Sequence, residues 1–467
     1  MMKQIRSRAL LGAVVAALAA TSLAACGGDE KTPADGDKSG SPAAGDQKVT
    51  ISVSDYPSTE NADARAAFER QAEAFQELYP NITIEPTETA YQADTIQALI
   101  AGGTMPTTLL IPFTDIGRMM ELDQVADLTD YAANSEALSN LNPSVAKIAT
   151  DSSGRIRGVP YSAYTMALLY NRSLFTEAGL DPDAPPTTWE EVRAAAKTLT
   201  EKTDAQGFEL MTMENTGGWM LTNMSYAFGG KPINDEGTES TVNNPGTKAA
   251  LEFYRAIRWD DNAMGDNFLV NWGDQANDFA SGKTAMTVFG ADAYNRFITN
   301  LGMSKDDYGV APLPQGTGGL GALGGGGVLV VNPASTPEQI DAAVKWAEFY
   351  WLAPYIDQER AVQRAKDDLA AGTPVGAPGL PIVNAAQYEK YLGWIAEYID
   401  VPRENYTLYT STVETLPIVP EPSVAGQEIY AALDPVVQEV LTNRDADIDK
   451  LLADAQVAVQ AILDAAQ

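Results

Sequence analysis

The sequence predicts an α/β fold with mostly parallel sheets. Apolar residues recur along the chain at the strand period and then at the helical period, in alternation, which is typical of this class. The composition, with 45% hydrophobic and 20% charged residues, is that of a globular protein, and the residues from Lys48 onward are enough for more than one domain. In such sheets ligands bind in loops at the carboxyl ends of strands.

The first predicted elements form a strand-helix-strand unit. The stretch "VTISVSD" (49–55) alternates apolar and polar residues and predicts a strand. Apolar residues at helical spacing predict a helix over 68–78, and a second strand follows at 82–84. The run "TTLLIPF" (107–113) predicts a buried strand.

Two later helices carry N-terminal signals. Thr188 with Glu191, and Thr336 with Gln339, have capping-box spacing ahead of helical apolar patterns. The same patterns assign four tryptophans to cores: Trp189, Trp259, Trp346 and Trp351.

The N-terminus has the layout of a secretory signal peptide over residues 1–25. Three basic residues precede an uncharged apolar run over 9–20, which is too short to be read as a membrane-spanning helix. The residues Leu23 to Cys26 resemble the lipobox of bacterial lipoproteins, whose cysteine receives a lipid. Cys26 is then a lipidation site and residues 26–47 a flexible linker; an ordinary signal with an incidental cysteine is the alternative.

Composition excludes several functions. Only 31 basic residues stand against 63 acidic ones, a formal net charge of −32, so nucleic acid is not an expected partner. The chain has no histidine, which excludes a Ser-His-Asp triad and an HExxH zinc site. With its one cysteine lipidated, thiol chemistry is excluded as well, and we expect no cofactor and no metal.

Two glycine-containing motifs do not predict nucleotide binding. "SGKTAMTV" (281–288) contains Gly-Lys-Thr, but Asn277 occupies the place of the first P-loop glycine and a strand pattern follows. The run "GTGGLGALGGGG" (316–327) lacks the P-loop lysine. We expect it to be a loop whose backbone approaches another group closely.

Several stretches together resemble one family. They are, in order, "GVPYSAYTMALLYNRSLFTEAGLDPDAPPTTWEEVRAAAKTL" (158–199), "FASGKTAMTVFGADA" (279–293), "DYGVAPLPQGTGG" (307–319), "GGVLVVNPASTPEQIDAAVKWAEFYW" (326–351) and an amphipathic helix from about Asp447. The set is similar to the bacterial extracellular solute-binding proteins of ABC transporters, in the carbohydrate class that includes maltose-binding protein.

The resemblance implies a periplasmic-binding-protein-like fold of two α/β lobes, each a mostly parallel sheet flanked by helices, joined by hinge crossovers. Lobe 1 would comprise 48–162 and 313–353, and lobe 2 would comprise 163–312 and 354–467. The implied crossovers fall at Ser162–Thr165, near Ala311–Pro314 and near Ala353–Pro354. The prolines there have a second interpretation as strand or helix terminators.

The resemblance also implies the function. The protein would be a monomer, exported and lipid-anchored to the outer face of the cytoplasmic membrane, that captures a small carbohydrate between its lobes. It would deliver this ligand to the permease subunits of an ABC transporter.

A sugar needs aromatic rings for its C–H faces and acid or amide groups for its hydroxyls. The candidates that meet these needs on loops after strands, or by match to the family's pocket, are Asp55, Tyr56, Tyr91, Phe113, Thr114, Asp115, Tyr164, Glu214, Asn215, Trp219, Trp272, Asp292, Tyr294 and Glu421. Gly325 and Gly326 would bring backbone amides to the ligand. Each side chain has the alternative of a packing or solvated role.

One departure from the family affects the ligand. The position of Asp292 is commonly aromatic in sugar binders, whereas this chain reads "FGADAY". We therefore expect a disaccharide, small oligosaccharide or glycoside, with Tyr294 as a possible stacking ring, instead of a long malto-oligosaccharide.

Two other classes remain open at this stage. A surface-anchored glycoside hydrolase could use two of the carboxylates of Asp115, Glu214, Asp292 and Glu421 as acid and base. An adhesin or peptide-binding receptor would show no lobe closure with small sugars.

Overall fold

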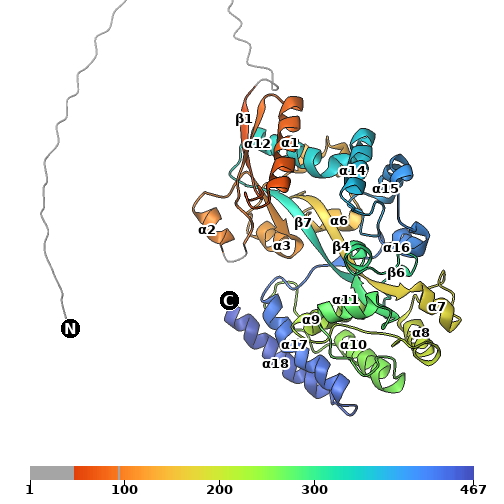
Figure 1. The fold of residues 1–467 in the computed structure, drawn as a ribbon. Coiled ribbons are helices and arrows are strands. Elements are labelled where there is room, and N and C mark those ends of the chain that lie inside the picture. The colour runs from red at the N-terminus through yellow and green to blue at the C-terminus, as the bar shows by residue number, and fades with distance from the viewer. Residues whose placement is uncertain (1–46, 93–94, 467) are drawn as a thin grey trace, which may run out of the picture. The chain divides into compact units, whose positions relative to one another are not determined.

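The computed structural model describes residues 47–92 and 95–466 (Figure 1). The predicted signal peptide, Cys26 and nearly all of the linker lie outside the described residues. Within the described part, no helix is both long enough and apolar enough to span a membrane.

Three strands near the start of the described chain form a parallel unit, as predicted. These are β1 (Val49–Val53), β2 (Ile82–Pro86) and β3 (Thr108–Pro112), with β1 between the other two. Helix α1 (Ala62–Leu78) connects β1 to β2 and buries Phe68 and Phe75. The predicted strand-helix-strand unit is confirmed.

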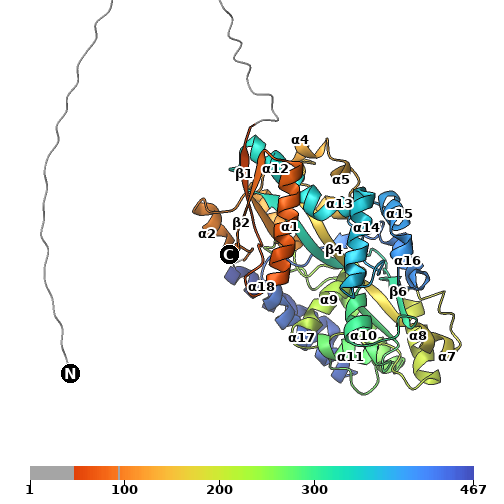
Figure 2. The same ribbon diagram turned by 45° about the horizontal axis from the view of Figure 1, so that its top comes forward.

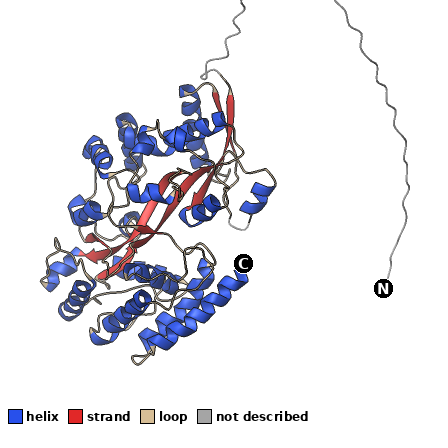
Figure 3. Cartoon of the chain, turned by 180° about the vertical axis from the view of Figure 1, so that it is seen from behind, coloured by secondary structure: helices blue, strands red, loops and turns tan. Residues whose placement is uncertain are grey.

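The sheet continues through strands that join two parts of the fold. Its order is β2-β1-β3-β7-β4-β5, with β6 also paired to β4 and β8 to β7. The bounds are β4 (Val159–Asn171), β5 (Met286–Gly290), β6 (Tyr308–Pro312), β7 (Ala322–Val331) and β8 (Ile418–Val419). Figure 3 shows these strands running diagonally through the chain with helices on both sides.

Strand β4 changes partners along its length. Residues from Val159 to Thr165 pair with β7, which pairs in turn with β3, whereas residues from Met166 onward pair with β5 and β6. We call β2, β1, β3, β7 and the first half of β4 the first sheet, and β5, β6 and the second half of β4 the second sheet. The change after Thr165 coincides with the first crossover expected from the sequence.

Strand direction differs from the sequence-based expectation. β3–β7, β4–β7, β4–β5 and β4–β6 are all antiparallel, so the mostly parallel description holds for β2, β1 and β3 but not for the crossing strands. A strand that returns from the second sheet to the first must enter it from the opposite end, which reverses its direction.

The glycine-rich run is also different from its prediction. Residues from Ala322 on belong to β7 and are not a loop. The predicted close approach is present, because a Cβ built on Gly326 would lie 2.0 Å from the Ser162 carbonyl oxygen and one built on Gly324 would lie 2.4 Å from that of Tyr164. The chain passes from the second sheet to the first between the end of β6 at Pro312 and the start of β7 at Ala322, and the second crossover expected near Ala311–Pro314 stays a prediction.

Helices surround both sheets (Figure 2). Before β4 lie α2 (Ile96–Ala101), α3 (Phe113–Glu121), α4 (Thr129–Ala132), α5 (Glu136–Ser139) and α6 (Pro143–Ile148). After β4 follow α7 (Arg172–Ala178), α8 (Trp189–Lys202), α9 (Thr216–Ala227), α10 (Pro245–Arg255), η1 (Ala256–Asp260), α11 (Trp272–Ala280) and η2 (Arg296–Asn300).

After β7 the chain is almost entirely helical. These helices are α12 (Pro337–Ala347), η3 (Glu348–Leu352), α13 (Ala353–Ile356), α14 (Gln358–Ala370), α15 (Ala385–Trp394), η4 (Ala396–Tyr398), η5 (Arg403–Tyr406), α16 (Thr407–Thr412), α17 (Gly426–Thr442) and α18 (Ile448–Ala466). Both predicted capping boxes are present, at the starts of α8 and α12. The last is the predicted C-terminal helix.

The contacts of the segment after α13 do not place the third crossover at a single position. Asn142 donates from its backbone amide to the Ile382 carbonyl oxygen and from its side chain to that of Pro381, next to the first sheet. Asn405 donates to the carbonyl oxygens of Lys305 and Asp306, next to the second. The segment between α13 and β8 therefore contacts both parts. The lobe boundaries expected from the sequence stay a prediction.

Candidate ligand-binding site

The crossing point of β4 places Tyr164 among carboxylates from distant parts of the chain. Tyr164 is half-buried in the last part of β4 that pairs with β7. Burial, followed by the negative charges of Glu421 and Asp292, raises the pKa of Tyr164 to about 12. Asp292 and Glu421, which lie 128 and 257 residues further along the chain, thus both act electrostatically on Tyr164, and we call Tyr164, Asp292 and Glu421 the crossing cluster.

Glu421 is held by its neighbours. It follows β8, and its Oε2 atom accepts a hydrogen bond of 2.8 Å from the hydroxyl of Tyr430 on α17. The Tyr226 hydroxyl on α9 donates to the carbonyl oxygen of Pro420, at 3.1 Å. The Tyr430 hydroxyl therefore holds the Glu421 carboxylate, and the Tyr226 hydroxyl holds the backbone beside it.

Asp292 follows β5, at the carboxyl end of that strand. Its side chain is accessible to solvent, yet the surrounding protein raises its pKa by desolvation.

Asp55 follows β1 in the first sheet and has a left-handed backbone, with φ of 60°. Its Oδ2 atom accepts a bond of 2.6 Å from the Ser54 hydroxyl, and its amide donates to the Thr89 carbonyl oxygen. Burial raises the pKa of the Asp55 carboxyl, and its charge in turn contributes to the raised pKa of Tyr161. The residue is fixed at the end of its strand, as predicted for a site loop.

Tyr91 and Asp115 form a second pair on this side. Burial, and then the Asp115 carboxylate, raise the pKa of Tyr91. The Thr114 hydroxyl donates to Asp115 at 2.8 Å. Tyr56 has other partners: its hydroxyl donates to Glu69, and the Arg65 guanidinium lies 3.8 Å from its ring centre.

Glu214, Asn215 and Trp219 lie at the start of α9. Both Glu214 and Asn215 have positive φ, at 57° and 65°, an unusual backbone for two consecutive residues that are not glycine. The buried carboxylate of Asp434 accepts bonds of 2.7 Å from the amides of Asn215 and Gly218 and stabilises this turn. Trp219 is half-buried, and Glu214 is exposed and accepts from Asn271.

The remaining aromatic candidates differ in exposure. Trp272 is 43% exposed and lies under the Arg296 guanidinium, 3.6 Å from the ring centre. Tyr294 is 1% exposed and packs edge-on against Tyr308, at 5.2 Å between ring centres. In this conformation Tyr294 is a packing residue.

Gly325 and Gly326 lie in β7 opposite Tyr164 and Ala163. A Cβ on Gly325 would come within 2.8 Å of the Tyr164 ring, so glycine at this position leaves space for the ring. The backbone of Gly325 and Gly326 therefore lies against β4 at Ser162 to Tyr164, and the expectation that their amides reach a ligand stays a prediction.

Tyr161 and Trp351 belong to the same face of the strands as Tyr164, although sequence reasoning did not select Tyr161 and placed Trp351 in a core. Their rings lie 4.5 Å apart. A β-bulge between Pro160 and Ser162 puts Tyr161 on the face of Tyr164, where regular alternation would put it on the other.

Trp351 lies in the π-helical segment η3, where the 3.6-residue period used for its assignment no longer applies. The core assignment fits Trp189 and Trp346, which are buried, better than the half-buried Trp259 and Trp351.

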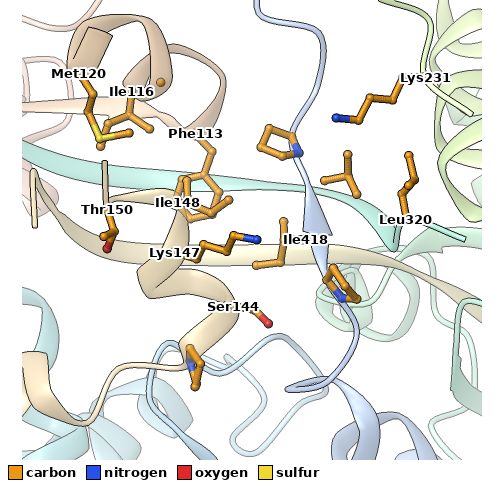
Figure 4. A pocket seen from close by; sticks show the side chains of 15 residues that line it. Phe113, Ile116, Met120, Ser144, Lys147, Ile148, Thr150, Lys231, Leu320 and Ile418 are labelled. Atoms are coloured by element: carbon orange, nitrogen blue, oxygen red, sulfur yellow. The ribbon is translucent and has the colours of Figure 1, made fainter. Parts of the chain in front are cut away.

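A cavity of about 660 Å³ lies beside the β8 segment (Figure 4). Its walls come from α3 and α6, from the β8 segment, and from Lys231 and Leu320. Of the predicted site residues, it contains Phe113, which is buried there beside Ile116. No member of the crossing cluster lines this cavity, although its wall includes Pro420, the residue before Glu421.

The described residues include no group of histidine, cysteine or acidic side chains arranged to hold a metal ion. What the arrangement offers chemically is a set of carboxylates and aromatic rings, which can accept hydrogen bonds from hydroxyls and stack on apolar faces.

Comparison with known proteins matches residues 58–351 to the bacterial extracellular solute-binding protein family. The sn-glycerol-3-phosphate-binding periplasmic protein UgpB of Salmonella typhimurium is 27% identical over 301 residues, which cover 60% of this chain and 65% of that protein. The chain therefore aligns with slightly less than two thirds of that relative's length.

Solved structures share the fold. The cyclic α-maltosyl-1,6-maltose binding protein of Arthrobacter globiformis has a TM-score of 0.64 and 21% identity, covering 89% of this chain and 99% of that one. UgpB of Mycobacterium tuberculosis, in complex with glycerophosphocholine, has a TM-score of 0.58 and 19% identity, covering 90% and 98%. The two-lobed α/β fold expected from the sequence is confirmed.

Proposed function

Because the chain belongs to the bacterial extracellular solute-binding protein family, we propose that it captures a carbohydrate between its two lobes and delivers it to an ABC importer. The observation that supports this most is the crossing cluster. Tyr164 on a strand shared by both sheets is acted on by Asp292 and Glu421, which follow strands β5 and β8. A ligand that contacts these groups would touch both lobes.

The mechanism is conformational. A ligand that bridges the lobes stabilises the closed state relative to the open state by its differential contacts, and a permease can then distinguish loaded from empty protein. Micromolar affinity corresponds to about −8 kcal/mol, which a few stacked rings and charge-assisted hydrogen bonds can supply. The protein acts by binding and release and is not an enzyme.

The ligand is a disaccharide, small oligosaccharide or glycoside. Relatives of this fold include binders of both sugars and glycerol phosphates. The crossing cluster supports the first class, because Asp292 and Glu421 would repel a phosphate and can accept hydrogen bonds from sugar hydroxyls.

The partners follow from the family. The ABC permease receives the ligand, and a lipid on Cys26 anchors the exported protein to the outer face of the cytoplasmic membrane. Labelling with a radioactive fatty acid, lost in Cys26→Ala, tests the anchor.

A binding screen tests the proposed function. Protein lacking residues 1–26 is titrated with mono-, di- and oligosaccharides, polyols, glycerol 3-phosphate and peptides, and both tryptophan fluorescence and melting temperature are recorded. We expect saturable changes with one class of sugar. A response only to peptides or to glycerol 3-phosphate would contradict the carbohydrate proposal.

Two controls sharpen the screen. Chromatography of the sugar after prolonged incubation should show no products, since release of shorter sugars would indicate a hydrolase. Small-angle scattering should show a smaller radius of gyration with the bound sugar, because lobe closure compacts the protein.

A further inference from the structure

A small cavity lies directly beneath Asp55, between the first sheet and the helices that cover it. Its volume is about 110 Å³, and its floor is formed by the adjacent strands β1, β3 and β7. Phe68 of α1 and the aromatic residues of α12 and η3 close the other side. At about 30 Å³ per water, it has room for a few waters or for one substituent of a ligand.

The cavity contains a polar group without a partner. Thr108 is 1% exposed and lines the cavity, and its hydroxyl has no hydrogen-bond partner. A buried hydroxyl left unpaired is destabilising. The neighbouring Thr107 hydroxyl does have a partner, because it accepts a hydrogen bond of 3.1 Å from the Ser52 amide. The Thr108 oxygen is itself closed off from the cavity, and a rotation of this side chain about χ1 would present the hydroxyl to a polar occupant.

The second polar feature is the Asp55 carboxylate. It is half-buried at the cavity, with the Ser54 hydroxyl as its side-chain donor at 2.6 Å. The influences on its pKa are burial and hydrogen bonds, and no cation is among them. The nearest arginine along this part of the chain, Arg65, is bound to Glu88 at 3.0 Å and to the Pro57 carbonyl oxygen. Among the described residues, no arginine or lysine forms an ion pair with Asp55.

Aromatic rings form the rest of the wall. Phe68, Tyr350 and Trp346 contact one another with ring centres 4.9 to 5.7 Å apart, and Trp351 lies 4.8 Å from Tyr350. The faces of such rings carry partial negative charge and attract cations. No basic side chain of the described residues lines the cavity.

We infer that this cavity is a subsite for a protonated amine, so that the solute is an amine-bearing sugar or glycoside. The ammonium group would donate hydrogen bonds to the Asp55 carboxylate and the Thr108 hydroxyl and contact the rings beside them. Hydrogen-bond acceptors, aromatic faces and a carboxylate without a cation all favour the same occupant. The inference rests on the proposed function, since it names the class of sugar bound.

The test compares ligands that differ only in the amine. Purified full-length protein in mild detergent is titrated by calorimetry with D-glucosamine, D-glucose and N-acetyl-D-glucosamine, and with chitosan and cellulose disaccharides as a longer matched pair. We expect the amine-bearing member to bind about tenfold more tightly in each comparison. Ethanolamine, a probe without a sugar, should alter tryptophan fluorescence at millimolar concentration.

Two conservative variants locate the effect. Asn tolerates the left-handed backbone of position 55, so Asp55→Asn should fold and should lose the tenfold preference for the amine. Thr108→Val removes a hydroxyl that has no protein partner, so it should leave melting unchanged or raise it while weakening amine binding about threefold. Thr107→Val is the matched control: it should lower the melting temperature and leave the preference intact.

The outcomes distinguish failure of the amine subsite from failure of the proposed carbohydrate-binding function. Equal binding of amine and neutral sugars, or a preference that survives Asp55→Asn, overturns the amine subsite and leaves the carbohydrate proposal standing. Binding of no sugar with either substituent overturns the proposed function itself. If ethanolamine has no effect and Thr108→Val only raises stability, the cavity is a water site.

Discussion

The two faces of the crossing strands β4 and β7 have different chemistry. One face holds Tyr164 near Asp292 and Glu421, with Tyr161 and Trp351 beside it. The other face holds Thr165, which is fully buried, and a separate cavity of 660 Å³ beside the β8 segment is lined by Phe113, Leu320 and Ile418 (Figure 4). Lys147 and Lys231 are the basic residues there, whereas the named groups around Tyr164 are acidic.

The comparison shows how one pair of strands can serve binding and stability separately. Successive side chains of a strand point to opposite faces, so Tyr164 and its neighbour Thr165 belong to different environments. Thr165 is fully buried and its hydroxyl lies 3.0 Å from that of Tyr409. We expect substitutions on the Tyr164 face to change ligand affinity and those on the other face to change the free energy of unfolding.

The largest effect is expected from Phe113→Ala. Removing a large ring that is 2% exposed should lower the free energy of unfolding by about 3–5 kcal/mol, measured by urea unfolding. Ligand affinity of the folded protein should stay the same. A large affinity loss in this variant would return Phe113 to the binding residues predicted from the sequence.

Gly326→Ala should come next. The added Cβ would meet the Ser162 carbonyl oxygen between the two crossing strands, and such overpacking costs about 1–3 kcal/mol. Gly393→Ala is the control, because no atom lies within 4 Å of its added Cβ and it sits in α15, where alanine should stabilise the helix. If Gly326→Ala and Gly393→Ala have the same melting temperature, the close approach of β4 and β7 does not require glycine at position 326.

A pair of neighbours tests the two faces directly. Thr165→Val should lower the free energy of unfolding by about 1 kcal/mol, because the buried Tyr409 hydroxyl loses its partner, and should leave affinity unchanged. Tyr164→Phe should do the reverse, with ligand binding about tenfold weaker and unfolding unchanged. Calorimetric titration and urea unfolding of both variants test this. A loss of affinity in Thr165→Val, or a loss of stability in Tyr164→Phe, would contradict the separate roles of the two faces.

The smallest effect concerns pH. The pKa of Asp292 is raised above 3.8 in the folded protein, so the folded state holds this proton more tightly than the unfolded state. Its contribution to stability is complete below pH 3.8 and declines as pH rises through the raised pKa. Asp292→Asn should therefore melt slightly higher than the parent protein at pH 7 without ligand, and this difference should vanish near pH 3. A constant difference across this range would contradict the desolvation of Asp292.

Much of the fold was predictable because its signals are local. The strand alternation at Val49, Ile51 and Val53 and the capping boxes at Thr188 and Thr336 each depend on residues a few positions apart. Site loops after β1, β3 and β5 followed from the same reasoning. The glycine-rich run was placed in a loop because glycine is usually found there, whereas its role in β7 depends on the proximity of β4.

Periodicity, composition and ordered motifs were enough to predict the α/β class, the family, and the residue types that a carbohydrate site needs. Which of those residues lie together depends on the tertiary fold. The charge of Glu421 acts on Tyr164 because β4 and β8 both pair with β7, and the bulge after Pro160 turns Tyr161 to the same face as Tyr164. Pairing of distant strands, and the face that each side chain then occupies, depend on packing of the whole chain, to which no local pattern in the sequence corresponds.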